Sequence, residues 1–285
     1  MKKTFSILLS SVLLAGTIGA IAYDKADAKT KAKTEHKAKE ERVIPYPKGY
    51  NLTEGAAGYA LKGNHKNSPY FSTVDYYNAK STKSRMILEK FKTYQQTKEY
   101  SCGPASALMV LNHNNVKKYD ELQIAKMMKS HVDIDGDNTA EKGVANERGE
   151  WGTSTDRMVS FFKQIGWNVK SSLDTQKSDG TTFASPDEFK TFVLHNLKQK
   201  TPVMVEWSDW GAHWQVVIGY DNMGTPDFIG DDVLILADPY DTSDHKQDGY
   251  YTFNMERFFY MWHDDRVMPE SQSNQQWIVA TPKNK

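Results

Sequence analysis

Apolar residues recur at helical spacing in four segments of the chain. Beyond Gly103 and Pro104 they follow one another at intervals of three and four residues, and a proline this early is typical of a first helical turn. The same period predicts helices over residues 120–130, 154–164 and 185–199. The last of these opens with Ser-Pro-Asp-Glu, a capping-box pattern with proline at the first helical position.

The last third of the chain has the pattern of strands instead. Short runs rich in valine, isoleucine and tyrosine predict strands over residues 202–206, 214–220, 233–237 and 250–253. Asn254 then stands where it can cap a final helix that carries Phe258, Phe259 and Trp262. Helices come first and an antiparallel sheet follows, an order that predicts an α+β fold rather than a doubly wound parallel sheet.

The N-terminus has the layout of a secretion signal. Two lysines precede an apolar run without charge from Phe5 to Ala22. Of two small-x-small cleavage sites, ending at Ala22 and Ala28, we favour the second, so residues 1–28 are predicted to be a signal peptide and the protein to be secreted or held in the cell envelope. An uncleaved anchor is the alternative, since the run approaches the roughly 18 apolar residues that span a bilayer.

Charge and composition narrow the classes of partner. Cleavage removes three of 36 basic and two of 36 acidic residues, which leaves a net charge of −1 and no electrostatic case for binding nucleic acid or a membrane surface. Residues 29–45, rich in lysine and glutamate, are predicted to be a flexible linker. Residues 46–285 suffice for one two-lobed domain or two small ones, and residues 46–90 are either integral to the first lobe, which we favour, or a removable cover.

Cys102 is the only cysteine, which excludes an internal disulfide, although exported proteins usually pair their thiols. A lone cysteine is most often a small core residue. Cys102 is instead predicted in the first turn of a helix, where unpaired N–H groups and the positive end of the helix dipole favour a thiolate over a thiol of pKa about 8.5. This placement makes Cys102 a candidate nucleophile.

A thiolate nucleophile needs a base, and His213 is the best placed of the eight histidines. It stands at the start of a strand in GAHWQVVIGYD, where Gly211 and Ala212 leave space in front of it. A histidine entering a strand is more often structural than catalytic. It therefore needs an orienting acid.

A hairpin between two of the predicted strands offers that acid. If Tyr220 lies opposite Asp231, His213 faces Asp238 on the same side of the sheet. The register is an assumption, and a shift by one residue would separate the two side chains. Asp221 is the alternative partner, at the other end of the strand.

Gln96, six residues before Cys102, is a candidate for the oxyanion hole. Its amide N–H₂ can swing toward the oxygen that becomes negative in acyl transfer, beside the backbone N–H of Cys102. Gln95 is the alternative if the loop has a different register. This chemistry requires no metal and no organic cofactor.

An acidic segment at residues 133–138 imitates the start of an EF-hand loop. Asn138 occupies the place of the required glycine and Val144 that of the closing glutamate. A solvated turn is therefore the preferred interpretation, and calcium binding stays open.

Three blocks in order, Gln-x5-Cys-Gly-Pro-Ala-Ser-Ala-Leu, GAHWQVVIGYD and VLILADPYD, resemble the papain-like cysteine peptidases related to the bacteriocin double-glycine leader peptidases. The resemblance implies a two-lobed papain-like fold, with the cysteine helix in one lobe and the histidine-bearing sheet in the other. It implies Cys102 as nucleophile, His213 as general base and acid, Asp238 as the orienting residue and Gln96 in the oxyanion hole.

The expected function is hydrolysis of a peptide or other amide bond by an exported enzyme. Processing of leader peptides is not expected, because those peptidases act on the cytoplasmic side of ABC exporters. CGPASALMVLN also resembles the catalytic helix of phytochelatin synthases, which implies a γ-glutamylcysteine transpeptidase or a glutathione hydrolase as an alternative. A non-catalytic binding module with a papain-like cleft is the alternative from another class.

Overall fold

The computed structural model describes residues 42–60, 74–130, 152–209, 211–242, 247–264 and 267–283. The predicted signal peptide, most of the predicted linker and the acidic segment at residues 133–138 lie outside the described residues. Arg42–Lys285 forms one compact unit. Its helices are α2 (Gly55–Ala60), α3 (Cys102–His113), α4 (Glu121–Met128), α5 (Thr155–Gln164), α6 (Pro186–Lys198) and α7 (Met255–Met261). Its strands are β1 (Arg85–Ile87), β2 (Trp167–Ser171), β3 (Val203–Ser208), β4 (Ala212–Asp221), β5 (Val233–Ala237), β6 (Tyr250–Asn254) and β7 (Gln276–Pro282).

Within the described residues, seven strands form one sheet in which every pair is antiparallel. The order is β2-β7-β3-β4-β5-β6. Strand β1 pairs with residues 219–221 of β4, beyond residues 212–217, which pair with β3. The last strand in sequence, β7, thus lies between β2 and β3. The predicted α+β fold with an antiparallel sheet is confirmed.

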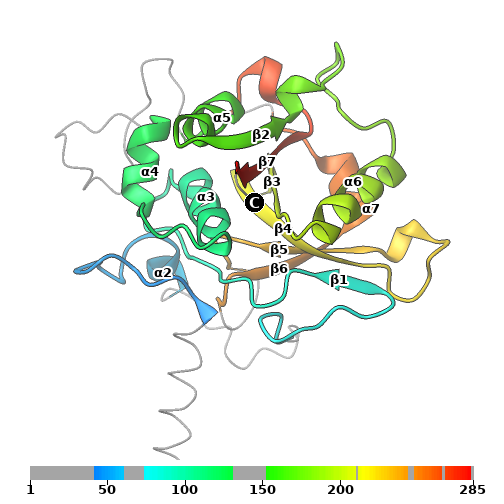
Figure 1. The fold of residues 1–285 in the computed structure, drawn as a ribbon, viewed down its shortest axis with the longest axis horizontal. Coiled ribbons are helices and arrows are strands. Elements are labelled where there is room, and N and C mark those ends of the chain that lie inside the picture. The colour runs from blue at the N-terminus through cyan, green and yellow to red at the C-terminus, as the bar shows by residue number, and fades with distance from the viewer. Residues whose placement is uncertain are drawn as a thin grey trace, which may run out of the picture. The chain divides into compact units, whose positions relative to one another are not determined.

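Helices pack on both sides of the central strands. Figure 1 shows α3, α4 and α5 on one side of β3 and β4, and α6 and α7 on the other. The first group starts with the cysteine helix and forms the helical lobe, whereas β4, which carries His213, belongs to the sheet lobe. This is the two-lobed arrangement that the sequence predicts.

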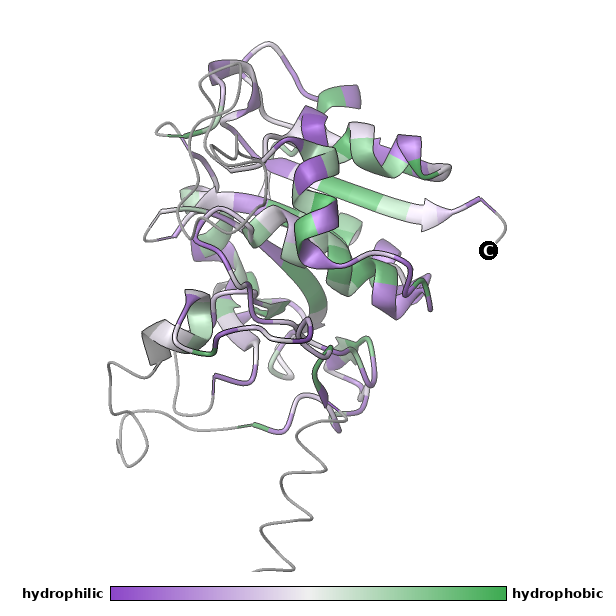
Figure 2. Ribbon diagram, turned by 90° about the vertical axis from the view of Figure 1, so that its left-hand side faces the viewer, coloured by the Kyte–Doolittle hydropathy of each residue, from purple (hydrophilic) through white to green (hydrophobic). Residues whose placement is uncertain are grey.

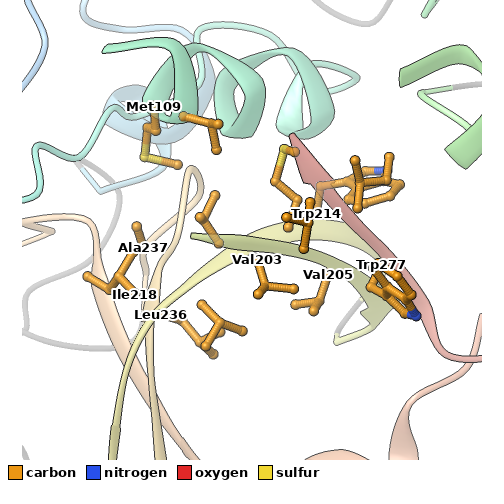
Figure 3. Close-up of a cluster of buried hydrophobic side chains, with 14 of the residues drawn as sticks. Met109, Val203, Val205, Trp214, Ile218, Leu236, Ala237 and Trp277 are labelled. Atoms are coloured by element: carbon orange, nitrogen blue, oxygen red, sulfur yellow. The ribbon is translucent and has the colours of Figure 1, made fainter. Parts of the chain in front are cut away.

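The core lies between α3 and the middle of the sheet. Figure 3 shows Met109 of α3 directed toward the strands that carry Ile218 and Ala237. Residues of β4 are buried from His213 to Tyr220, so this strand is covered on both faces. Figure 2 shows the same concentration of hydrophobic residues on the strands, including most of β7. Residues at the strand ends are therefore held on a rigid base.

The predicted helix starts are confirmed where a polar side chain caps the helix. Ser185 accepts a hydrogen bond from the backbone N–H of Glu188, and Pro186 is the first residue of α6. Asn254 accepts one from the N–H of Arg257 and so begins α7. Each cap side chain accepts a hydrogen bond from the backbone N–H three residues later, so the local sequence is sufficient to locate these helix starts.

Several elements were not predicted. Helix α2 and strands β1, β2 and β7 carry no strong local signal. Strands β2 and β7 form by pairing with each other across more than a hundred residues, from Trp167 opposite Pro282 to Ser171 opposite Ile278. A pairing of this kind depends on tertiary structure, so the pattern of neighbouring residues does not predict it.

The register predicted for the hairpin of β4 and β5 is wrong. Tyr220 pairs with Leu234, not with Asp231. The loop is longer than predicted because residues 229–231 form a 3₁₀ turn and the carboxylate of Asp232 accepts a hydrogen bond from the Tyr220 hydroxyl. The chain thus folds back before it enters β5.

The segment before β1 packs against the loop that leads to α3. The backbone N–H of Ile44 donates to Thr93 O at 2.9 Å, and that of Ala56 donates to Gln96 O at 3.2 Å. The ring of Tyr46 lies 5.4 Å from that of Tyr94. No helix among the described residues combines the length and the apolar character needed to cross a bilayer.

Candidate active site

Cys102 is the first residue of α3, within the first turn as predicted. Its side chain is free of a disulfide and only 8% exposed. The first N–H groups of a helix have no acceptor within the helix, so they are available to an anionic group at this end. Gly103 permits close packing here, because a Cβ at this position would lie 2.8 Å from Cβ of Thr153.

A buried carboxylate holds the loop that leads into α3. Glu121, at the start of α4, accepts hydrogen bonds from Thr97 N at 2.8 Å, Thr97 Oγ1 at 2.6 Å, Ser101 Oγ at 2.5 Å and the Tyr94 hydroxyl at 2.9 Å. Burial raises the pKa of Glu121, although these hydrogen bonds oppose the shift. Residues 94–101 are therefore fixed to α4, and the position of Cys102 follows from them.

The same loop is joined to the sheet lobe. The side chain of Gln95 donates to Asp238 O at 2.7 Å and accepts from the backbone N–H of Asp241 at 3.1 Å. The backbone N–H of Gln96 donates to Pro239 O at 2.7 Å. These bonds place the end of β5 beside the start of α3. They also commit Gln95 to a structural contact rather than to the oxyanion hole.

The predicted contact between His213 and Asp238 is present. His213 Nε2 lies 2.6 Å from Asp238 Oδ1, and both residues are buried, at 5% and 4% exposure. Asp238 also accepts hydrogen bonds from the backbone N–H of Tyr240 at 2.8 Å and from the side chain of Gln215 at 2.9 Å. Asp221, the alternative partner, pairs with Val233 at the far end of the strand.

A β-bulge explains why this contact forms despite the incorrect register. Val217 pairs with Leu236 but Gly219 pairs with Ile235, so Ile218 is one additional residue in β4. Beyond the bulge, extension of the ladder places Asp238 opposite Gln215, two residues from His213 and on the same face. Without it, Asp238 would lie on the opposite face from His213.

Cys102 and His213 interact through their side chains. Burial lowers the pKa of His213, but the charge of Asp238 and hydrogen bonds with Asp238 and Cys102 outweigh it, so this pKa lies well above 6.5. Asp238 binds Nε2, which leaves Nδ1 as the ring nitrogen available to the sulfur. An imidazolium between a sulfur and a carboxylate can stabilise a thiolate and later supply a proton.

Gln96 lines the same cavity as Cys102, where the sequence predicts an oxyanion-hole residue. Its side-chain N–H₂ donates to Lys98 O at 2.7 Å and, in a longer bond of 3.3 Å, to Glu99 O. Its Oε1 is buried and lacks a hydrogen-bond partner among the described residues. Donation to a substrate oxygen therefore requires the weaker of these two bonds to break.

These side chains surround a cavity of about 180 Å³ between the two lobes. It is lined by the loop before α3, the residues before α5, Glu206 of β3, the start of β4, Tyr240 and residues 267–268. Trp207 and Trp214 are both 1% exposed core residues, but only Trp214 forms part of the cavity wall. Within the described part of the chain, no group of three or more histidine, cysteine or acidic side chains could hold a metal ion.

Three residues near the site were missed from the sequence. Gln215 could have been found, since it lies two residues from His213 and therefore on the same face of a strand. Glu121 and Glu206 had no such signal, because a carboxylate is buried only where tertiary structure brings partners to it. Glu206 lines the cavity at 1% exposure.

Comparison with known proteins places the chain in a family. The peptidase domain of Streptococcus ComA, a bifunctional ABC transporter involved in quorum sensing, is similar at 18% identity and a TM-score of 0.40 over 68% of this chain and 99% of that one. The peptidase domain of Streptococcus mutans ComA is 16% identical, with a TM-score of 0.30 over 67% and 100% of the two chains. No curated protein matches. Residues 88–266, well over half of the chain, match the Peptidase_C39 like family. The protein thus belongs to this cysteine-peptidase family, in agreement with the resemblance of its three sequence blocks.

Proposed function

We propose that this protein is an exported cysteine peptidase that hydrolyses a peptide or other amide bond through Cys102. The observation that carries the proposal is that Cys102 and His213 line one cavity, with His213 Nε2 2.6 Å from Asp238 Oδ1. Family membership supports the same chemistry. Export rests on the predicted signal peptide at residues 1–28.

In the proposed reaction, the Cys102 thiolate attacks the scissile carbonyl carbon and forms a tetrahedral oxyanion. The backbone N–H of Cys102 and the amide of Gln96 donate hydrogen bonds to that oxygen. His213 then gives its proton to the leaving amine as the C–N bond breaks and an acyl-enzyme remains. Water attacks the thioester, His213 takes its proton, and Cys102 is released with the acid product. Asp238 holds the imidazole ring throughout.

The test is hydrolysis of a fluorogenic peptide library by the chain without residues 1–28, with Cys102→Ala as the comparison. Hydrolysis should disappear in the variant, and so should labelling by iodoacetamide at pH 6–7. Circular dichroism and the denaturation midpoint should stay close to those of the wild type. Full hydrolysis by Cys102→Ala would refute the mechanism.

The rate of alkylation at different pH values separates this proposal from a binding module. A sulfur paired with the imidazolium of His213 should react well below pH 8, whereas an ordinary thiol reacts slowly until the pH approaches its pKa of about 8.5. Release of glycine from glutathione, without peptide hydrolysis, would favour a transpeptidase instead.

A further inference from the structure

Glu206 is a buried acidic side chain at the wall of the cavity. It is the fourth residue of β3, is 1% exposed, and lines the cavity together with Cys102 and Trp214. Neither of its carboxyl oxygens accepts a hydrogen bond from a described residue. A buried polar group in this condition is costly unless something else satisfies it.

The carboxyl next to Glu206 belongs to Asp264. Burial is the first cause that raises the pKa of Glu206, and the charge of Asp264 and a side-chain hydrogen bond with it are the next two. A hydrogen bond between two carboxyls needs one shared proton, so the pair retains one negative charge. Asp264 Oδ1 also accepts from the N–H of Val267, which lines the cavity, at 3.2 Å. The pair therefore joins two walls of the cavity.

The rest of the cavity suits the stem of a long side chain. Its surface is contributed mainly by apolar groups, among them Trp214, Ala212 and Met268. Glu99, which accepts a hydrogen bond from the Tyr240 hydroxyl at 3.2 Å, adds a second carboxylate to the lining. Of the lining residues that the structure describes, none is a lysine or an arginine. A thiolate and an imidazolium cancel, so the cavity has a net negative charge.

We propose that this cavity binds a positively charged side chain of the substrate, lysine or arginine, beside the bond that Cys102 cleaves, with Glu206 as the residue that determines this specificity. The aliphatic stem lies against the apolar wall, and the cationic end supplies the donors that the oxygens of Glu206 lack. A neutral side chain of the same length leaves the oxygens of Glu206 without a donor. The inference rests on the proposed function and adds a substrate class to it.

Peptidyl chloromethyl ketones test the preference without a known substrate. Acetyl-tripeptide reagents carry lysine, norleucine or citrulline either at the residue next to the ketone or one residue before it, and alanine elsewhere. The second-order rate constant for alkylation of Cys102 is measured at pH 7 by mass spectrometry. The proteins are the mature wild type, Glu206→Gln, and Glu256→Gln as a control that makes the same substitution on α7, outside the cavity.

At one of the two positions, the wild type should react about 10- to 100-fold faster with the lysine reagent than with the norleucine reagent, the range that a charged hydrogen bond supplies. This ratio should fall to about threefold or less in Glu206→Gln and stay within about twofold of wild type in Glu256→Gln. The citrulline reagent should resemble norleucine, because it lacks the charge.

Equal rates for lysine and norleucine at both positions in the wild type would overturn the specificity, and this comparison holds even if Glu206→Gln fails to fold. A ratio unchanged by Glu206→Gln in a folded variant would overturn the role of Glu206. If the citrulline reagent reacts as fast as the lysine reagent, the proposal that the cavity recognises a positive charge is wrong. Failure of every reagent to modify native Cys102, with modification of the denatured chain, would instead contradict the proposed function.

Discussion

Replacing Glu121 by alanine is expected to destabilise the protein and to impair a site that the residue does not touch. The variant removes the acceptor of four buried hydrogen bonds. Ser101 keeps Lys98 O as an alternative acceptor at 2.8 Å, but among the described residues the N–H and hydroxyl of Thr97 and the Tyr94 hydroxyl bond to Glu121 alone. Each buried group left without a partner costs about 1–3 kcal/mol.

Since the two hydroxyls can rotate or take up water, the free energy of unfolding should fall by about 3–5 kcal/mol, a large share of the roughly 5–15 kcal/mol typical of a domain. Urea unfolding followed by tryptophan fluorescence measures this difference. The loop that carries Gln96 and leads to Cys102 also loses its anchor. We expect kcat/KM per folded molecule to fall at least about tenfold, because misplacement by an ångström is sufficient for such a loss.

Two further variants distinguish the anchor from a general loss of stability. Glu121→Gln keeps one oxygen acceptor and should lie between wild type and Glu121→Ala in both measurements. Asp120→Ala removes the exposed N-cap of the same helix, which accepts from Gln123 N, and should cost about 1 kcal/mol with kcat/KM unchanged. If Glu121→Ala unfolds within 1 kcal/mol of wild type, or retains full activity per folded molecule, the reasoning about this loop is wrong.

Three other outcomes are expected. Asp238→Asn removes the charge that raises the pKa of His213, so the pH profile of thiol alkylation should move to higher pH and kcat/KM should fall by about a hundredfold or more; an unmoved profile would contradict this role. Gln96→Ala should lower kcat by about 10²–10³ but hardly change alkylation by iodoacetamide, because that reaction develops no oxyanion; equal losses in both assays would indicate displacement of the nucleophile. The pKa of Glu206 is raised, so the folded protein keeps a proton that the unfolded chain releases above pH 4.5. The stability that Glu206 contributes is therefore complete below that pH. It declines by about 1.4 kcal/mol per pH unit until the folded-state pKa is reached. Glu206→Gln should remove this slope in urea unfolding between pH 5 and 8, and parallel curves for the two proteins would refute it.

Sequence predicted those parts of the fold that depend on neighbouring residues. The caps at Ser185 and Asn254 bond to backbone groups three residues away, and the first turn of α3 follows from the Gly-Pro pair after Cys102. Strand β7 was not predicted, because it forms by pairing with β2 and β3, which are distant in the chain. Its five buried residues lack the alternation by which a half-exposed strand is recognised.

The contact between His213 and Asp238 was predicted correctly from an incorrect hairpin register. The assumed hairpin register and the observed one near the site differ by an even number of residues, which keeps Asp238 on the side of His213. The bulge at Ile218 makes the difference even. Gly219 beside it is the kind of residue that marks a bulge within a strand, but it does not by itself fix the register. The buried carboxyls of Glu121 and Glu206 had no signal in the sequence, since their surroundings come from other elements.

The pairing of β4 with β5 determines on which side of the sheet each side chain lies. The loop between the two strands does not determine it. The exposed residues 223–228 could be lengthened, shortened or replaced by a foreign epitope without displacing the imidazole from its carboxylate. One residue added to or deleted from the five between His213 and Gly219, the partner of Ile235, would have a much larger effect. Tolerance to insertion should therefore change abruptly at Asp221, which a scan of single-alanine insertions along the hairpin would reveal.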